Sequence, residues 1–147
     1  ASVFGTDASA EAIEVARGNA RSLRVADRCR FECGDLAAPA QTMRFDAVLA
    51  NLPYVPSADV PQKPDPVGFE PRAALDGGAD GLALYRRFVP GLPALLLPGG
   101  VALMEAAPHQ MAALTALVRR RFPAARVRAE RDFGGAERYV RVEAPGA

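Results

Sequence analysis

The stretch that decides the fold runs from Phe45 to Tyr54, FDAVLANLPY. Residues 45–50 form a short, mainly apolar run, which predicts one buried strand. The strand is predicted to end at Asn51, and Leu52, Pro53 and Tyr54 follow directly. Open α/β folds bind ligands at the carboxyl ends of their parallel strands, so we expect a rigid hydrogen-bonding pocket at this point.

The groups that follow this strand suit the binding of a planar NH2 group. Asn51 offers one carbonyl acceptor and two amide donors. Leu52 precedes a proline, which restricts its backbone to extended values and nearly fixes the direction of its carbonyl. These two oxygens could accept the two hydrogens of an NH2 group, while Tyr54 provides a flat aromatic face. A strand followed by a proline-stiffened turn explains the same four residues equally well when they are taken alone.

Longer motifs carry a resemblance to a known family. NLPY at 51–54 resembles the [NDS]-P-P-[YFW] signature of amino-methyltransferases that use S-adenosylmethionine. NLPYVP, followed by GFEPRAALDGGADGLALYRRF at 68–88, is similar to the HemK/PrmC family of protein-(glutamine-N5) methyltransferases, and the match extends over nearly the whole chain. The motif departs from the family at Leu52, where a first proline is usual. The Leu52 carbonyl is retained, but its rigidity then depends on Pro53 alone.

The order of predicted elements is that of an α/β protein. We expect strands over 1–7, 29–33, 45–50, 101–105, 126–131 and 138–142, with helices after Ser9, over 81–97 and from Pro108. Pro90 and Pro93 are expected to bend or interrupt the helix over 81–97. This order resembles the seven-stranded, Rossmann-like methyltransferase sheet with helices on both faces, lacking its first, central strand. In that family the first strand carries the glycine-rich loop that holds the methionine part of the cofactor. We therefore expect residues 1–147 to be an N-terminally truncated catalytic domain, and the 147-residue chain alone to bind the cofactor weakly or not at all.

Two carboxylates follow predicted strands, at Asp7 and Asp35. A carboxylate at a strand end of a nucleotide-binding α/β domain can accept both ribose hydroxyls, although Asp is also a common loop cap and turn residue. The resemblance implies that S-adenosylmethionine is the cofactor, with Asp7 at its ribose and Asp35 at its adenine. The contacts it implies are Asp7, Ala8, Asp35, Leu36 and Asn51.

An irregular segment at 53–71 contains six prolines, which excludes a helix or a central strand. Long irregular loops in compact domains are usually lids or binding loops, so we interpret 53–71 as a substrate-facing loop. Val55, Val60, Val67 and Phe69 are expected to pack it. Glu70 and Arg72 flank Pro71, and either an ion pair within the loop or contact with the substrate would explain them.

The resemblance implies a catalytic role for Asn51, Leu52, Pro53 and Tyr54, without a metal, on a glutamine of a peptide chain release factor. An adenine-N6 methyltransferase acting on DNA or RNA would share the pocket, but a net charge of +1 argues against phosphate-driven binding. A binding or structural module without activity is the third hypothesis. No signal peptide or membrane-spanning run is evident, which favours a cytoplasmic protein with reduced, buried cysteines at Cys29 and Cys33.

Overall fold

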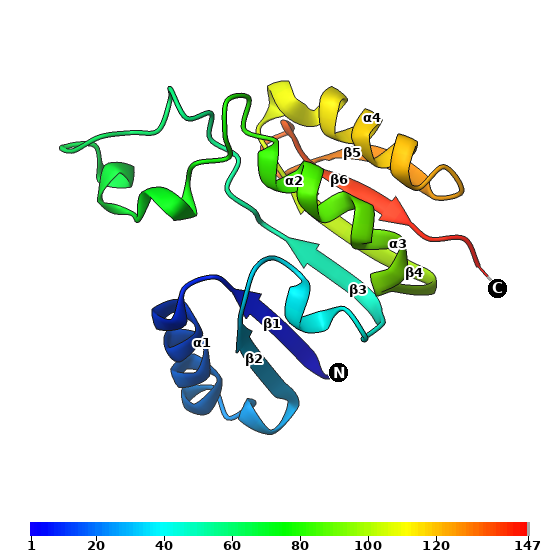
Figure 1. Ribbon diagram of the computed structural model, residues 1–147, viewed down its shortest axis with the longest axis horizontal. Coiled ribbons are helices and arrows are strands. Elements are labelled where there is room, and N and C mark those ends of the chain that lie inside the picture. The colour runs from blue at the N-terminus through cyan, green and yellow to red at the C-terminus, as the bar shows by residue number, and fades with distance from the viewer. Residues whose placement is uncertain (147) are drawn as a thin grey trace. The chain divides into compact units, whose positions relative to one another are not determined.

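The computed structural model describes residues 1–146 and divides into two compact units, Ala1–Met43 and a larger one that begins at Arg44 (Figure 1). The first unit contains strand β1 (Val3–Asp7), helix α1 (Ala10–Ser22) and strand β2 (Cys29–Cys33), with short 3-10 turns at Ala26–Arg28 and Ala38–Ala40. β1 and β2 pair in parallel, with Asp7 opposite Cys33. Because the strands are parallel and in this register, their carboxyl ends lie side by side at the same edge of the sheet.

Helix α1 confirms the prediction from its cap and spacing. Ser9 is its N-cap, and the Ser9 hydroxyl accepts a hydrogen bond from the Ala12 N–H at 3.1 Å. Ile13 and Ala20, which lie on the same face of the helix, are buried. The helix crosses back over the strands to connect them, as a parallel pair requires.

The second unit is a four-stranded sheet in the order β3-β4-β6-β5. Its strands are β3 (Phe45–Ala50), β4 (Leu96–Glu105), β5 (Arg126–Arg131) and β6 (Glu137–Glu143), and its helices are α2 (Ala83–Phe88), α3 (Leu92–Leu95) and α4 (Met111–Arg121). β3 is parallel to β4, whereas β6 is antiparallel to both β4 and β5. The short helices and α4 cover one face of this sheet (Figure 1).

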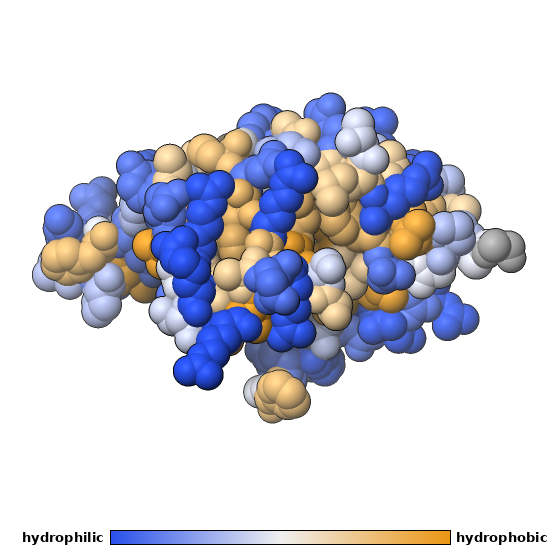
Figure 2. Space-filling model, turned by 90° about the horizontal axis from the view of Figure 1, so that it is seen from below, coloured by the Kyte–Doolittle hydropathy of each residue, from blue (hydrophilic) through white to orange (hydrophobic). Residues whose placement is uncertain are grey.

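The core of the second unit lies between those helices and the sheet. Tyr85, Leu92, Met104 and Leu114 are fully buried there, together with Val140 and Val142 of β6. Alternation along β6 places Arg141 and Glu143 on the other face, where Glu143 forms ion pairs with Arg126, Arg128 and Arg141. The molecular surface seen in Figure 2 has apolar areas interspersed among hydrophilic side chains. None of the helices within residues 1–146 has the length and apolar character needed to span a bilayer.

The interruption that Pro90 and Pro93 predict within the helix at 81–97 is confirmed, but the predicted ends are wrong, because the helical turns run only from Ala83 to Leu95. The chain forms α2, a 3-10 turn at Val89–Gly91 and α3, because Pro90 and Pro93 lack the N–H groups that a continuous helix needs. β4 then begins at Leu96, which pairs with Phe45 before the register shifts to Val101 opposite Ala47. The intervening residues include Gly99 at φ +75, a backbone conformation that glycine adopts without strain.

The expected burial also fails at several positions. Cys33 is exposed and Cys29 half-buried, although both are free thiols. In the proline-rich segment Val60 is buried as predicted, but Val67 and Phe69 are exposed. The segment contains two 3-10 turns, Pro66–Phe69 and Arg72–Ala74.

Candidate functional site

The two predicted acceptor oxygens stand at the end of β3, which stops at Ala50. Asn51 is exposed and Leu52 half-buried. Within residues 1–146, neither the Asn51 side chain nor the Leu52 carbonyl oxygen takes part in a hydrogen bond. Both groups therefore lack a hydrogen-bond partner among the described residues.

The backbone after Pro53 is held against residues 75–78. The Val55 N–H donates to the Leu75 carbonyl at 2.9 Å, and the Gly77 N–H donates back to the Val55 carbonyl at 2.8 Å. The Ser57 N–H donates to the Gly78 carbonyl at 2.9 Å. The glycine-rich turn, residues 75–82, therefore supports the backbone of the NLPY segment.

Two glycines of that turn permit its close approach to the segment. A Cβ atom at Gly77 would lie 2.7 Å from the Pro53 carbonyl oxygen, and one at Gly81 would lie 2.1 Å from that of Tyr54. Both distances are below any normal contact, so no side chain fits at either position.

Gln110 joins the turn to the segment from the start of α4. Its side-chain Nε2 donates to the carbonyl oxygens of Tyr54 at 2.8 Å and Asp80 at 3.0 Å. Its Oε1 accepts from the Ala107 N–H at 3.0 Å. Gln110 is 2% exposed, so its amide is fully used in a dry environment, where each hydrogen bond matters most.

The Tyr54 ring is oriented by a carboxylate at the end of β4. Its hydroxyl donates to Glu105 Oε1 at 3.1 Å. Arg138 Nε lies 3.9 Å from the same oxygen. Partial burial raises the pKa of the Tyr54 hydroxyl, and the hydrogen bond and negative charge of Glu105 raise it further. The phenol therefore stays protonated and keeps its hydrogen bond at neutral pH.

Tyr85 of α2 contacts the backbone next to Asn51. Its side chain is fully buried, and burial raises the pKa of its hydroxyl well above the ordinary value. The hydroxyl contacts the Ala50 carbonyl oxygen at 3.3 Å, accepts from the Leu52 N–H at 3.5 Å and donates to the Glu105 carbonyl oxygen. It therefore contacts the backbone on both sides of Asn51.

The first unit brings the two predicted carboxylates to one sheet edge. Asp7 ends β1, and Asp35 follows β2 by two residues. Asp7 Oδ1 accepts from the Ser9 N–H at 2.8 Å, so this carboxylate also caps the turn into α1. The Leu36 carbonyl accepts from the Thr6 hydroxyl at 2.7 Å, with Leu36 at φ 49. Asp7, Ala8 and Asp35 are exposed at this edge.

Arg72 anchors the proline-rich segment, one of the two roles that the sequence left open. Its Nη2 lies 2.8 Å from Asp76 Oδ2 and donates to the Ser57 carbonyl at 3.0 Å. The Ser57 hydroxyl in turn donates to Asp76 Oδ1 at 2.6 Å. Hydrogen bonds from Ser57, the Gly78 N–H and Arg72 lower the pKa of Asp76.

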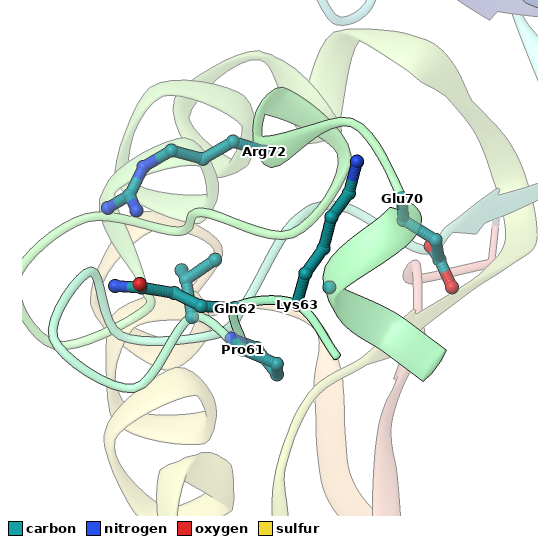
Figure 3. A pocket seen from close by; sticks show the side chains of 7 residues that line it. Pro61, Gln62, Lys63, Glu70 and Arg72 are labelled. Carbon is teal, nitrogen blue, oxygen red and sulfur yellow. The ribbon is translucent and has the colours of Figure 1, made fainter. Parts of the chain in front are cut away.

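A pocket of about 390 Å³ lies beside these residues, within the proline-rich segment. It is lined by Val60, Pro61, Gln62, Lys63, Gly68, Glu70 and Arg72. In Figure 3 the Gln62 and Arg72 side chains extend to the same side of the pocket, whereas the Glu70 carboxylate extends the other way. Lys63 lies 4.8 Å from the centre of the Phe69 ring, a cation–π contact across the turn.

Sequence reasoning did not find the roles of Tyr85, Gln110 and Glu105. Tyr85 lies within the helix predicted over 81–97, but the contacts of its hydroxyl depend on where the ends of β3 and β4 meet. Gln110 was not predicted as a site residue, because a glutamine near the start of a helix does not by itself indicate a role. What Gly77 and Gly81 approach depends on the tertiary structure.

The chain is similar in sequence to known methyltransferases. Residues 1–64 match the family model of the RMKL-like methyltransferase domain. The release factor glutamine methyltransferase of Moorella thermoacetica is 45% identical over 119 residues, which is 81% of this chain and 42% of that protein. The protein of the same name from Caulobacter vibrioides is 39% identical over 138 residues, 93% of this chain and 47% of its own length. The chain thus spans about half the length of such relatives or less.

Solved structures support the same fold. A methyltransferase from Pyrococcus furiosus has a TM-score of 0.68 at 15% identity, covering 99% of this chain and 64% of that one. TrmN from Thermus thermophilus has a TM-score of 0.61 at 22% identity, covering 97% of this chain and 36% of that one. The expected Rossmann-like methyltransferase fold is confirmed, with its strands here in two sheets. In sequence, the chain is similar to part of the release factor glutamine methyltransferases, and its fold is that of the Rossmann-like methyltransferases.

Proposed function

We propose that the protein containing this chain transfers a methyl group from S-adenosylmethionine to the side-chain amide of a glutamine in a protein, with a peptide chain release factor as the substrate. The observation that carries the proposal is the pair of available acceptors, Asn51 Oδ1 and the Leu52 carbonyl oxygen, on a backbone fixed by Pro53 and by residues 75–78. The relatives' names support the substrate class. A cytoplasmic location, where release factors act, is part of the same proposal.

The residues of the first unit fit the proposed cofactor. Asp7 and Asp35 place two exposed carboxylates at one edge of a parallel sheet, which suits ribose hydroxyls and an exocyclic amine. Ala8 and Leu36 follow them directly in the chain and complete the cofactor contacts proposed for this unit. When bound, S-adenosylmethionine supplies an electrophilic methyl group on a sulfonium sulfur.

Asn51 and Leu52 orient the substrate amide in this proposal. An amide nitrogen is a weak nucleophile, because its lone pair is delocalised into the carbonyl. Two fixed oxygen acceptors hold both N–H bonds and stabilise the positive charge that develops on nitrogen during attack. Tyr54 supplies the flat face beside the amide, and its hydrogen bond to Glu105 fixes the ring. The proline-rich segment, including Glu70 and Arg72, contributes the surface for the polypeptide around the glutamine.

Methylation of a glutamine peptide tests the proposal. Asn51→Ala should lower kcat by about 100-fold or more, the scale of losing one positioned polar group, while the protein remains folded. Mass spectrometry of the product locates the methyl group on the glutamine side chain. Asn19→Ala, an exposed helix substitution in α1, is the matched control and should retain full activity. Wild-type turnover by Asn51→Ala would remove Asn51 from the mechanism.

A further inference from the structure

We infer that Tyr85 is a positioning residue that sets the direction of the Asn51–Leu52 backbone; this inference rests on the proposed function. Its hydroxyl stands between the ends of β3 and β4. It contacts the Ala50 carbonyl and the Leu52 N–H on one strand and the Glu105 carbonyl on the other. Asn51 is the residue between the two β3 contacts.

The hydroxyl takes the place of the next backbone hydrogen bond between these strands. The parallel register ends with Ala50 opposite Met104. If the ladder continued, the Leu52 N–H would donate directly to the Glu105 carbonyl, because parallel strands bond at every second residue. Instead the Leu52 N–H approaches the Tyr85 oxygen at 3.5 Å, and that hydroxyl donates to the Glu105 carbonyl.

The consequence is a controlled separation of the two strand ends. A hydroxyl inserted into the ladder keeps both backbone groups partnered, and it holds them further apart than a direct bond of about 2.9 Å would. The strands therefore diverge at Asn51 without leaving an unpaired buried group. The peptide that carries the Leu52 carbonyl starts from this fixed point and is fixed at its other end by Pro53.

The burial of Tyr85 makes the position rigid. The side chain has no exposed surface, and Phe88 and Leu92 of the following turns are buried in the same core. A rotation of the ring would require repacking of that core, so the hydroxyl has one location. The Tyr85 hydroxyl contacts only backbone atoms, so it acts on the reaction through the positions of Asn51 and Leu52. A displacement of these residues by about 1 Å can lower the rate about 100-fold.

Removal of the hydroxyl alone tests the inference. Tyr85→Phe should lower kcat for a glutamine peptide by about 10- to 100-fold and leave KM for S-adenosylmethionine within about twofold, because positioning of the amide is lost, whereas the proposed contacts of Asp7, Ala8, Asp35 and Leu36 with the cofactor are kept. Tyr139→Phe is the matched control, since within residues 1–146 the Tyr139 hydroxyl makes no hydrogen bond. It should retain wild-type kinetics. Full kcat in a folded Tyr85→Phe variant overturns the inference.

Amide hydrogen exchange supplies a readout independent of activity. In the wild-type protein the Leu52 N–H should exchange at least about tenfold more slowly than in an unstructured peptide, although no backbone carbonyl accepts it. In Tyr85→Phe that protection should disappear, while Val48 within β3 stays protected. An unprotected Leu52 amide in the wild type overturns the inference even if the variant does not fold. An inactive wild-type protein with a protected Leu52 amide would instead count against the proposed function alone.

Discussion

The carbonyl oxygen of Tyr54 lies so close to Gly81 that a Cβ atom at that glycine would come within 2.1 Å of it. Gly81 has φ +76, so an alanine there would be strained even without the collision. Gly81→Ala should therefore lower the free energy of unfolding by roughly 2–4 kcal/mol and displace the Tyr54 backbone. Chemical denaturation measures the loss. Gly91→Ala is the control, because a Cβ atom at Gly91 meets nothing within 4 Å and should change stability by less than about 0.5 kcal/mol.

Replacement of Gln110 by leucine should be costly for a different reason. The change removes three hydrogen bonds and leaves the Tyr54 and Asp80 carbonyls and the Ala107 N–H without the partner that Gln110 provides. Buried polar groups left unpaired cost about 1–3 kcal/mol each, so we expect a loss of at least about 2 kcal/mol. Thr115→Val provides the contrast, because the buried Thr115 hydroxyl has no partner within residues 1–146 and its removal should be neutral or stabilising. Equal losses in the two variants would show that the Gln110 bonds add nothing.

The stability of the second unit should depend on the ionisation of Asp80. Hydrogen bonds from Arg86, and then from the Leu82 N–H, lower the pKa of Asp80 from 3.8 to about 2. Because the folded-state pKa is the lower one, the stabilisation is complete above about pH 4 and is lost as the pH falls towards 2. Asp80→Asn should flatten the decline in thermal midpoint over this range. Asp59→Asn, an exposed carboxylate without an ion pair among the described residues, should leave the decline unchanged.

Arg72 and Glu70 should differ in what their loss does to the proline-rich segment. Arg72→Gln removes the ion pair with Asp76, so we expect thermolysin to cleave near Val67 and Phe69 several times faster. Glu70→Gln should leave that cleavage rate unchanged, because no ion pair of Glu70 is found within residues 1–146. If Glu70→Gln raises KM for the peptide and Arg72→Gln does not, Glu70 is the one that contacts the substrate. Equal cleavage rates for Arg72→Gln and wild type would argue against the anchoring role.

Asp7→Asn tests the proposed cofactor contact while keeping the local turn. The asparagine oxygen can still accept the Ser9 N–H, so α1 should begin as before. Loss of the negative charge should weaken S-adenosylmethionine binding about tenfold, measured by calorimetry. Asp27→Asn, at an exposed turn before β2, is the control. Unchanged affinity in Asp7→Asn would exclude Asp7 from the ribose site.

The sequence predicted strands most accurately where the pattern was local. Residues 29–33 and 45–50 are strands with those bounds, because alternation and apolar runs favour an extended backbone. The burial predicted for 45–50 is wrong, since only Ala50 is buried in that strand and Leu49 is exposed. The helix over 81–97 was extended too far, since periodicity alone could not show that Leu96 pairs with Phe45. The acceptors at Asn51 and Leu52 were predictable from side-chain chemistry and the following proline. The groups that hold them were not, because Tyr85, Glu105 and Gln110 meet only when α2, β4 and α4 are assembled.

The arrangement of charge on β5 has a consequence for self-association. This strand lies at the edge of its sheet, and it carries Arg126, Arg128 and Arg131 along its length. Another strand that added itself there, in the manner of an amyloid layer or a swapped dimer, would have to align beside a row of guanidinium groups. A strand added at this edge would have to desolvate these charged side chains and disturb the ion pairs that Arg126 and Arg128 form, so this border of the sheet disfavours the addition of another strand.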